Sequence, residues 1–190
     1  SRNPFVIALR HPEYWQRLVG TGGAWLLYDF VYYGTTFNQP AILEKLFGKV
    51  DSLWSNCLQN LAAGSFGLPG VLLAIACIRG MGTKRLQGWG FVAIAATSAL
   101  FATVLLAAPS NVPASFACMC LLITALNWGV NVSSYVLPTE VFPAEIRSSF
   151  FGVSAAMGKL GALLGGAFFG PLAAGSEGLP TVFILCTGVA

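Results

Sequence analysis

The chain has 190 residues, of which 56% are hydrophobic and only 9% are charged, and its mean hydropathy is +0.73. Soluble domains carry about 25% charged residues, so a water-soluble fold of this size could not cover its surface. The composition therefore indicates a chain embedded in a lipid bilayer. The formal net charge of +3 comes from dispersed basic residues, which argues against a nucleic-acid-binding protein.

Charged residues mark the breaks between apolar segments that could span a membrane, each of which needs about 20 mostly apolar residues. The long uncharged stretch between Arg85 and Glu140 is divided by APSNVPA, residues 108–114, which is typical of a turn. The small residues of GALLGGAFFG, residues 161–170, predict close packing between helices. The sequence thus predicts an all-α integral membrane bundle, with a polar segment at 1–17 followed by spans at about 18–38, 56–78, 88–107, 114–137, 148–171 and a truncated 180–190.

The basic residues are distributed unevenly between the two sides of this bundle. Only Lys45 and Lys49 fall on the side away from the N-terminus. By the positive-inside rule, the N-terminus of the segment is predicted to be cytoplasmic. The chain begins without methionine and ends inside an apolar run, so we expect a piece of a longer protein. The basic residues on the N-terminal side are Arg2, Arg10, Arg17, Arg79, Lys84, Arg85 and Arg147.

The sequence has few residues in patterns that bind metals or catalyse reactions. The five cysteines lie in apolar stretches without the spacing of a zinc site, and the one histidine, His11, lies in a polar stretch. We find no pairing of a nucleophile with a base and no phosphate-binding glycine loop. We therefore expect no metal, no cofactor and no enzymatic activity.

Asp29 interrupts the first predicted span, in the sequence AWLLYDFVYYG. A carboxyl group at membrane depth is costly and usually faces a cavity or a partner. Trp25, Asp29 and Tyr33 recur every four residues, so they share one face of a helix. Their indole N–H, carboxyl and phenol groups could bind an oxyanion when Asp29 is protonated. The alternative is that the aromatic rings only pack and Asp29 pairs with a base elsewhere.

Two further polar positions lie inside predicted spans. Asn127 and Asn131 are four residues apart, and their amides could either contact a ligand or hydrogen-bond a neighbouring helix. Lys159 is the only base inside a span. It could pair with a carboxylate, hold an anion or extend toward the interface.

Four stretches resemble the phosphate:proton symporters of the major facilitator superfamily. GTGGAWLLYDFVYYGTTFNQ is similar to the seventh helix of that family, and LPGVLLAIACIRGMGTKRLQGWGF to the end of the eighth helix and the following loop. NWGVNVSSYVLPTEVFPAEIRSSFFG resembles the tenth helix with its Pro-x-Glu-x-Phe-Pro-x-x-x-Arg-Ser signature, and VSAAMGKLGALLGG the eleventh. The resemblance covers roughly residues 17–171 and implies that residues 18–190 form the C-terminal transmembrane half.

The resemblance also implies roles for particular residues. Trp25, Asp29, Tyr33 and Asn131 would be phosphate ligands. Asp29 would carry the coupling proton, binding phosphate when protonated and repelling it when ionised, and Lys159 would be a supporting intramembrane charge. Arg79 and Gly80 stand where the family has an acid followed by arginine, in the loop that latches the cytoplasmic side. The residues left for cytoplasmic gating are Glu140, Arg147 and Lys84.

The function implied is proton-coupled uptake of inorganic phosphate by alternating access, in the plasma membrane. Its partners would be phosphate, a proton, the lipid bilayer and the N-terminal half of the transporter. One alternative is the transport of another anion or organic solute, such as a glycerophosphodiester or a sugar. The other is a nutrient sensor that does not transport, or a degenerate fragment.

Overall fold

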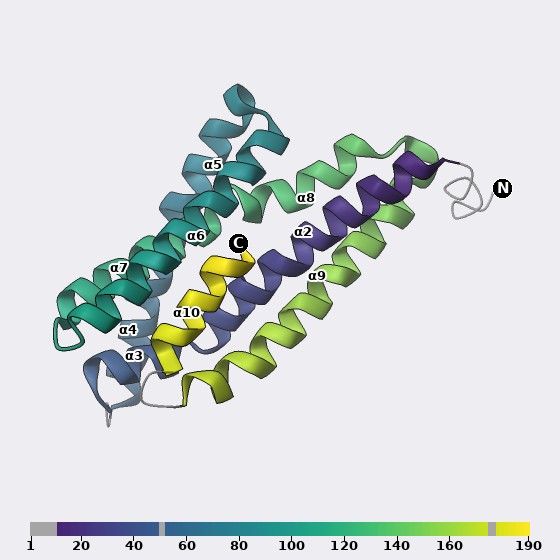
Figure 1. Ribbon diagram of the computed structural model, residues 1–190. Coiled ribbons are helices and arrows are strands. Elements are labelled where there is room, and N and C mark those ends of the chain that lie inside the picture. The colour runs from purple at the N-terminus through teal and green to yellow at the C-terminus, as the bar shows by residue number, and fades with distance from the viewer. Residues whose placement is uncertain (1–10, 50–51, 175–177) are drawn as a thin grey trace.

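The computed structural model describes residues 11–49, 52–174 and 178–190, and every regular element in this part of the chain is an α-helix (Figure 1). Residues 1–10, which make up most of the predicted N-terminal segment and include Arg2 and Arg10, lie outside the described part. From Pro12 the chain is already helical. The helices are α2 (Pro12–Phe37), α3 (Gln39–Phe47), α4 (Leu53–Ser65), α5 (Gly67–Met81), α6 (Thr83–Ala107), α7 (Val112–Asn127), α8 (Val130–Val141), α9 (Ala144–Ala173) and α10 (Gly178–Val189).

Four helical segments in the described residues are long and apolar enough to cross a membrane. Two are the single helices α6 and α9, and two are interrupted segments, Leu53–Met81 with α4 and α5, and Val112–Val141 with α7 and α8. Helix α2 has 26 residues, which gives a length of about 39 Å and also suffices to cross a bilayer. Helix α10 is shorter, with 12 residues. These helices confirm the predicted all-α membrane class.

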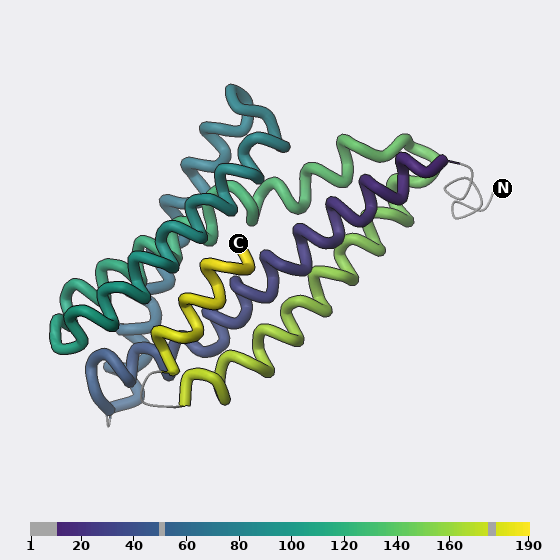
Figure 2. The backbone as a smooth tube through the Cα atoms, in the orientation of Figure 1, coloured from purple at the N-terminus to yellow at the C-terminus, as the bar shows by residue number. Residues whose placement is uncertain are grey.

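Helices α2 and α9 run side by side along the length of the molecule (Figures 1 and 2). We call this contact the α2–α9 seam. A Cβ atom at Gly161 would meet the carbonyl oxygen of Leu26, and one at Gly165 would meet that of Phe30. The two backbones can approach this closely only because these positions have no side chain. The close packing predicted from GALLGGAFFG is therefore confirmed.

A second group of helices packs beside the seam. Helix α10 lies mainly against α6, where the rings of Phe101 and Phe183 are 4.5 Å apart between centroids. Helices α6 and α8 meet at two glycines, because a Cβ at Gly90 would clash with the backbone of Val130, and one at Gly129 with Gly90. Large side chains fill the space between the helices, and Phe101, Met119, Leu122 and Phe183 are all fully buried.

The boundary between α7 and α8 is a true break in the helix. Trp128 has an extended backbone, with φ −93° and ψ 136°, and Gly129 has φ +78°, which favours glycine. The N–H of Val130 donates to the carbonyl of Trp128 at 3.0 Å and not to that of Leu126. The Leu126 carbonyl instead accepts a hydrogen bond from the Tyr28 hydroxyl on α2, at 2.9 Å.

Candidate functional site

Asp29 lies in the middle of α2 and is almost completely buried, with 3% of its surface exposed. Its Oδ2 atom has no hydrogen-bond partner among the described residues. Among the described residues, the Trp25 indole and the Lys159 ammonium are close enough to interact electrostatically with its carboxyl group. A buried oxygen without a partner calls for a proton, a water or a ligand. The carboxyl group is thus placed to respond to a proton or to a bound molecule.

Trp25 is held rigidly one turn before Asp29. Its ring meets Tyr135 of α8 edge-on at 4.7 Å between centroids and Phe151 of α9 at 5.7 Å. A Cβ at Gly158 would clash with the indole, so this glycine makes room for the ring. Aromatic pairs of this kind fix an orientation as well as burying apolar surface. Packing therefore fixes the position of the indole beside the carboxyl group.

Tyrosines surround the same part of α2. The rings of Tyr28 and Tyr32 are 5.4 Å apart between centroids, and those of Tyr32 and Tyr33 are 5.2 Å apart. Tyr28 is buried and uses its hydroxyl on the Leu126 carbonyl, whereas Tyr33 is half-buried. Tyr28 was not among the predicted site residues, although a tyrosine next to an acid in an apolar run was a usable signal.

Lys159 reaches this group from α9. Its Nζ atom donates to the Tyr33 hydroxyl at 3.3 Å and lies 5.0 Å from the centre of that ring. Lys159 is exposed, and within the described residues it forms no ion pair with a carboxylate. The ion pair with a carboxylate that the sequence analysis considered for Lys159 is therefore absent from this part of the chain. The ammonium group instead contacts Tyr33.

Asn131 stands in the first turn of α8, directly after the break at Gly129. Its Nδ2 donates to Asn127 Oδ1 at 3.0 Å, and Asn127 Nδ2 donates to the Ile123 carbonyl at 2.9 Å. Both hydrogen bonds join residues of the same α7–α8 segment. Neither of these bonds connects the segment to a helix outside it. Tyr135, one turn after Asn131, packs on Trp25. Helix α8 therefore approaches α2 beside Trp25 and Asp29.

The residues expected at the cytoplasmic gate lie near the N-terminal end of α2. A cavity of about 660 Å³ opens there between α2, α6 and α8, and Lys84 and Glu140 both line it. Glu140 accepts a hydrogen bond from the Thr83 hydroxyl at 2.9 Å. Within the described residues, no ion pair joins Glu140 to Lys84 or to Arg147.

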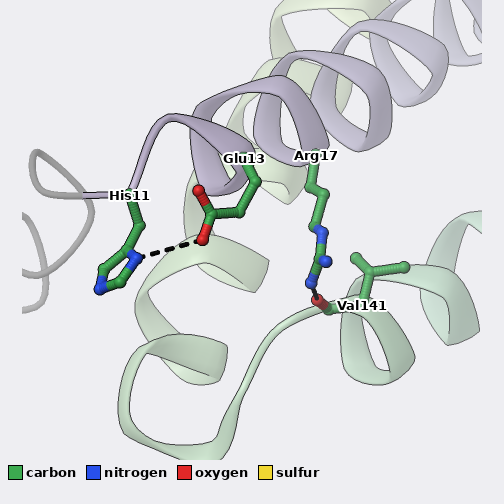
Figure 3. A network of polar contacts seen from close by, with 4 residues as sticks. All are labelled: His11, Glu13, Arg17 and Val141. Carbon is green, nitrogen blue, oxygen red and sulfur yellow. Dashed lines mark hydrogen bonds and ion pairs between the residues drawn. The ribbon is translucent and has the colours of Figure 1, made fainter.

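Arg147 lies outside this cavity, in the first turn of α9, where its Nε donates to the Phe142 carbonyl at 3.0 Å. Arg17 makes a similar contact from α2, since its Nη1 donates to the Val141 carbonyl at 2.7 Å (Figure 3). Two arginines thus hold neighbouring carbonyls at the connection between α8 and α9. The same figure shows the surface contact between His11 and Glu13, at 3.1 Å.

Comparison with known proteins finds a transporter family and individual relatives that are named as transporters or permeases. The model of the family described as "Sugar (and other) transporter" matches residues 21–190. An inorganic phosphate transporter of Toxoplasma gondii is 37% identical over 93% of the chain and 31% of its own length. A repressible high-affinity phosphate permease of Neurospora crassa is 30% identical over 82% of the chain and 28% of its own length.

A glycerophosphoinositol permease of Candida albicans is 28% identical over 90% of the chain and 33% of its own length. The chain therefore spans about a third of the length of these relatives.

Proposed function

Because this chain belongs to the sugar (and other) transporter family of the major facilitator superfamily, we propose that it forms one half of a secondary transporter that takes up inorganic phosphate together with a proton. The observation that carries the proposal is the buried Asp29 carboxyl group beside the fixed indole of Trp25, since one of its oxygens has no partner among the described residues. The names of the relatives from Toxoplasma gondii and Neurospora crassa support phosphate as the substrate.

Four side chains would bind the anion. Protonated Asp29 donates through its carboxyl O–H, and Asn131 donates through the amide N–H that Asn127 does not use. The remaining donors are the indole N–H of Trp25 and the phenol O–H of Tyr33. Lys159, bonded to the Tyr33 hydroxyl, adds a positive charge to the site.

Coupling follows from the charge of Asp29. When its carboxyl group is protonated, it attracts the phosphate oxygens, and when the proton leaves, the carboxylate repels them. Proton and phosphate then leave the site together. Opening to alternate sides of the membrane requires the N-terminal half to rock against this one, and we place the whole in the plasma membrane with the N-terminus of this segment in the cytoplasm.

The gate would close at the cytoplasmic end of the bundle. Lys84 and Glu140 line the same cavity there, so a charge from the N-terminal half could reach both. Arg147 would act through the backbone, because it holds the Phe142 carbonyl and so fixes the connection between α8 and α9.

The test is phosphate uptake into proteoliposomes by a chimera in which this chain replaces the matching segment of the Toxoplasma gondii relative. The parent chimera should take up phosphate faster under an inward proton gradient, and Asp29→Asn should lose that dependence. Glu44→Gln, which changes an exposed acid on α3, is the matched control and should behave like the parent. A parent that ignores phosphate, or an Asp29→Asn variant as gradient-dependent as the parent, would reject the proposal.

The relative from Candida albicans makes an organic phosphate ester the second candidate substrate. Competition separates the two. Glycerophosphoinositol that blocks phosphate uptake at a lower concentration than unlabelled phosphate would favour the ester, and weaker competition would favour inorganic phosphate.

A further inference from the structure

A second cavity lies beside the C-terminal part of α2, after Asp29. We call it the outer cavity. It has a volume of about 310 Å³ and lies between the last turns of α2, the start of α3, the α4–α5 junction and α7. Its polar lining includes Tyr32, Thr35, Gln39 and Asn127, and its apolar lining includes Leu68 and Ile123. None of the described residues that line it carries a charge.

Thr35 gives the clearest sign that this cavity binds something. Only 2% of its surface is exposed, yet its hydroxyl has no hydrogen-bond partner among the described residues. Threonine hydroxyls elsewhere in the helices, such as those of Thr97 and Thr103, bond to a carbonyl of the preceding turn. A buried hydroxyl left without a partner is costly, and Thr35 is one of the residues that line this cavity.

Tyr32 and Asn127 add donors to the same space. The Tyr32 hydroxyl makes no hydrogen bond within the described residues, and Asn127 uses one of its two N–H groups on the Ile123 carbonyl. The Asn127 oxygen accepts from Asn131. Asn127 therefore links the lining of the outer cavity to Asn131, one of the proposed phosphate ligands.

Gln39 supplies an acceptor. Its Nε2 atom donates to the backbone and side-chain oxygens of Asn60, at 3.0 Å and 3.3 Å, which leaves Oε1 free to accept. A lining with both donors and an acceptor fits a ligand that itself carries O–H groups and oxygen atoms. Dihydrogen phosphate has both, whereas sulfate at neutral pH has no proton to donate. The volume leaves room for the ion and several waters, since a water occupies about 30 Å³ in the liquid.

We propose that the outer cavity is a second binding site for a protonated tetrahedral oxyanion, dihydrogen phosphate, which occupies it before reaching Asp29. The inference rests on the proposed function, because it assumes phosphate as the substrate. Without a cation the cavity holds the ion only weakly, which suits a site of passage. Thr35 and Asn127 bind the ion there, and Asn127 passes it toward Asn131.

The experiment uses the same chimera and compares Thr35→Val, which removes the hydroxyl, with Thr35→Ser, which keeps it. Thr35→Val should raise the KM for phosphate about threefold to tenfold, as expected for one lost hydrogen bond, and leave kcat and the proton dependence unchanged. Thr35→Ser should keep the KM of the parent. Thr97→Val is the matched control, because Thr97 lies on α6 and its hydroxyl is already bonded to the Ala93 carbonyl.

Each outcome has one meaning, provided that the variants elute like the parent in size-exclusion chromatography. An active parent with equal KM values in Thr35→Val and Thr35→Ser overturns the outer site and leaves the proposed function standing. A rise in KM that Thr35→Ser shares, or that Thr97→Val reproduces, also overturns it, because the hydroxyl is then not the cause. A parent that ignores phosphate overturns both proposals.

Discussion

The α2–α9 seam and the segment formed by α4 and α5 differ in how apolar their sequences are and in how much of them is buried. The most apolar window of Leu53–Met81 has a mean hydropathy of 2.1, but only 17% of it is buried inside the molecule. The corresponding window of Ala144–Ala173 is less apolar, at 1.3, yet 33% of it is buried. The more hydrophobic segment is therefore the less buried one.

The reason lies in the solvent. Lipid chains are as apolar as leucine, so leucines of α4 and α5 gain nothing by moving from lipid into the protein. Helix association then depends on how closely the backbones approach, and this favours Gly, Ala and Ser. In this chain, the more hydropathic segment is therefore the more exposed one, whereas small residues mark the contacts between helices.

The largest effect is expected from a methyl group added inside the seam. In Gly161→Ala the new Cβ meets the Leu26 carbonyl, a backbone atom that cannot swing away. We expect a loss of about 1–3 kcal/mol in the free energy of unfolding, measured by thermal unfolding in detergent micelles. Gly152→Ala on the same helix, where the Cβ meets nothing within 4 Å, is the control and should not destabilise. Equal melting temperatures for the two variants would contradict the close approach.

A smaller effect is expected from the polar contact across the seam. The hydroxyls of Thr21 and Ser154 are 2.9 Å apart and buried. A double-mutant cycle with Thr21→Val and Ser154→Ala should give a coupling of about 0.6 kcal/mol, the average for such bonds between membrane helices. The coupling stays small because the Thr21 hydroxyl also has the Arg17 carbonyl within reach, at 2.9 Å. Strict additivity of the two changes would show that the hydroxyls do not interact.

The smallest effect is expected on the exposed surface of α5. Leu72 on α5 is 66% exposed, so Leu72→Ala removes few contacts within the protein. The free energy of unfolding of the chain in micelles should change by less than about 0.5 kcal/mol. A loss as large as that of Gly161→Ala would mean that other parts of the protein cover this face of α5. That result would contradict the difference in burial between the two regions.

Charges and prolines divided the sequence into apolar segments, but the interruptions within those segments were not predicted. Nothing local distinguishes Gly129, which breaks a helix, from Gly165, which lies inside one. The difference comes from neighbours, since Gly129 touches Gly90 on α6 and Gly165 touches α2. The junction after Ser65 is similar, because the Phe66 carbonyl accepts from Thr124, 58 positions along the chain.

The spacing of Trp25, Asp29 and Tyr33 predicted that they share one face of a helix, and all three lie on α2. It could not show that Asp29 is buried while Lys159 is exposed, because burial depends on how α2 and α9 pack. Nor could it decide between the two roles considered for Asn131. The structure shows its amide bonded to Asn127 at the end of α7, and its second N–H has no partner among the described residues.

The break between α7 and α8 ties together two positions that are far apart in the sequence. Gly129 ends the regular hydrogen bonding, which leaves the Leu126 carbonyl for the hydroxyl of Tyr28. A residue at 129 that restored a continuous helix would reclaim that carbonyl and leave a buried phenol without an acceptor. A phenylalanine at 28 would instead leave the carbonyl unpaired. Positions 28 and 129 are therefore expected to covary in an alignment of relatives, although their side chains share no contact.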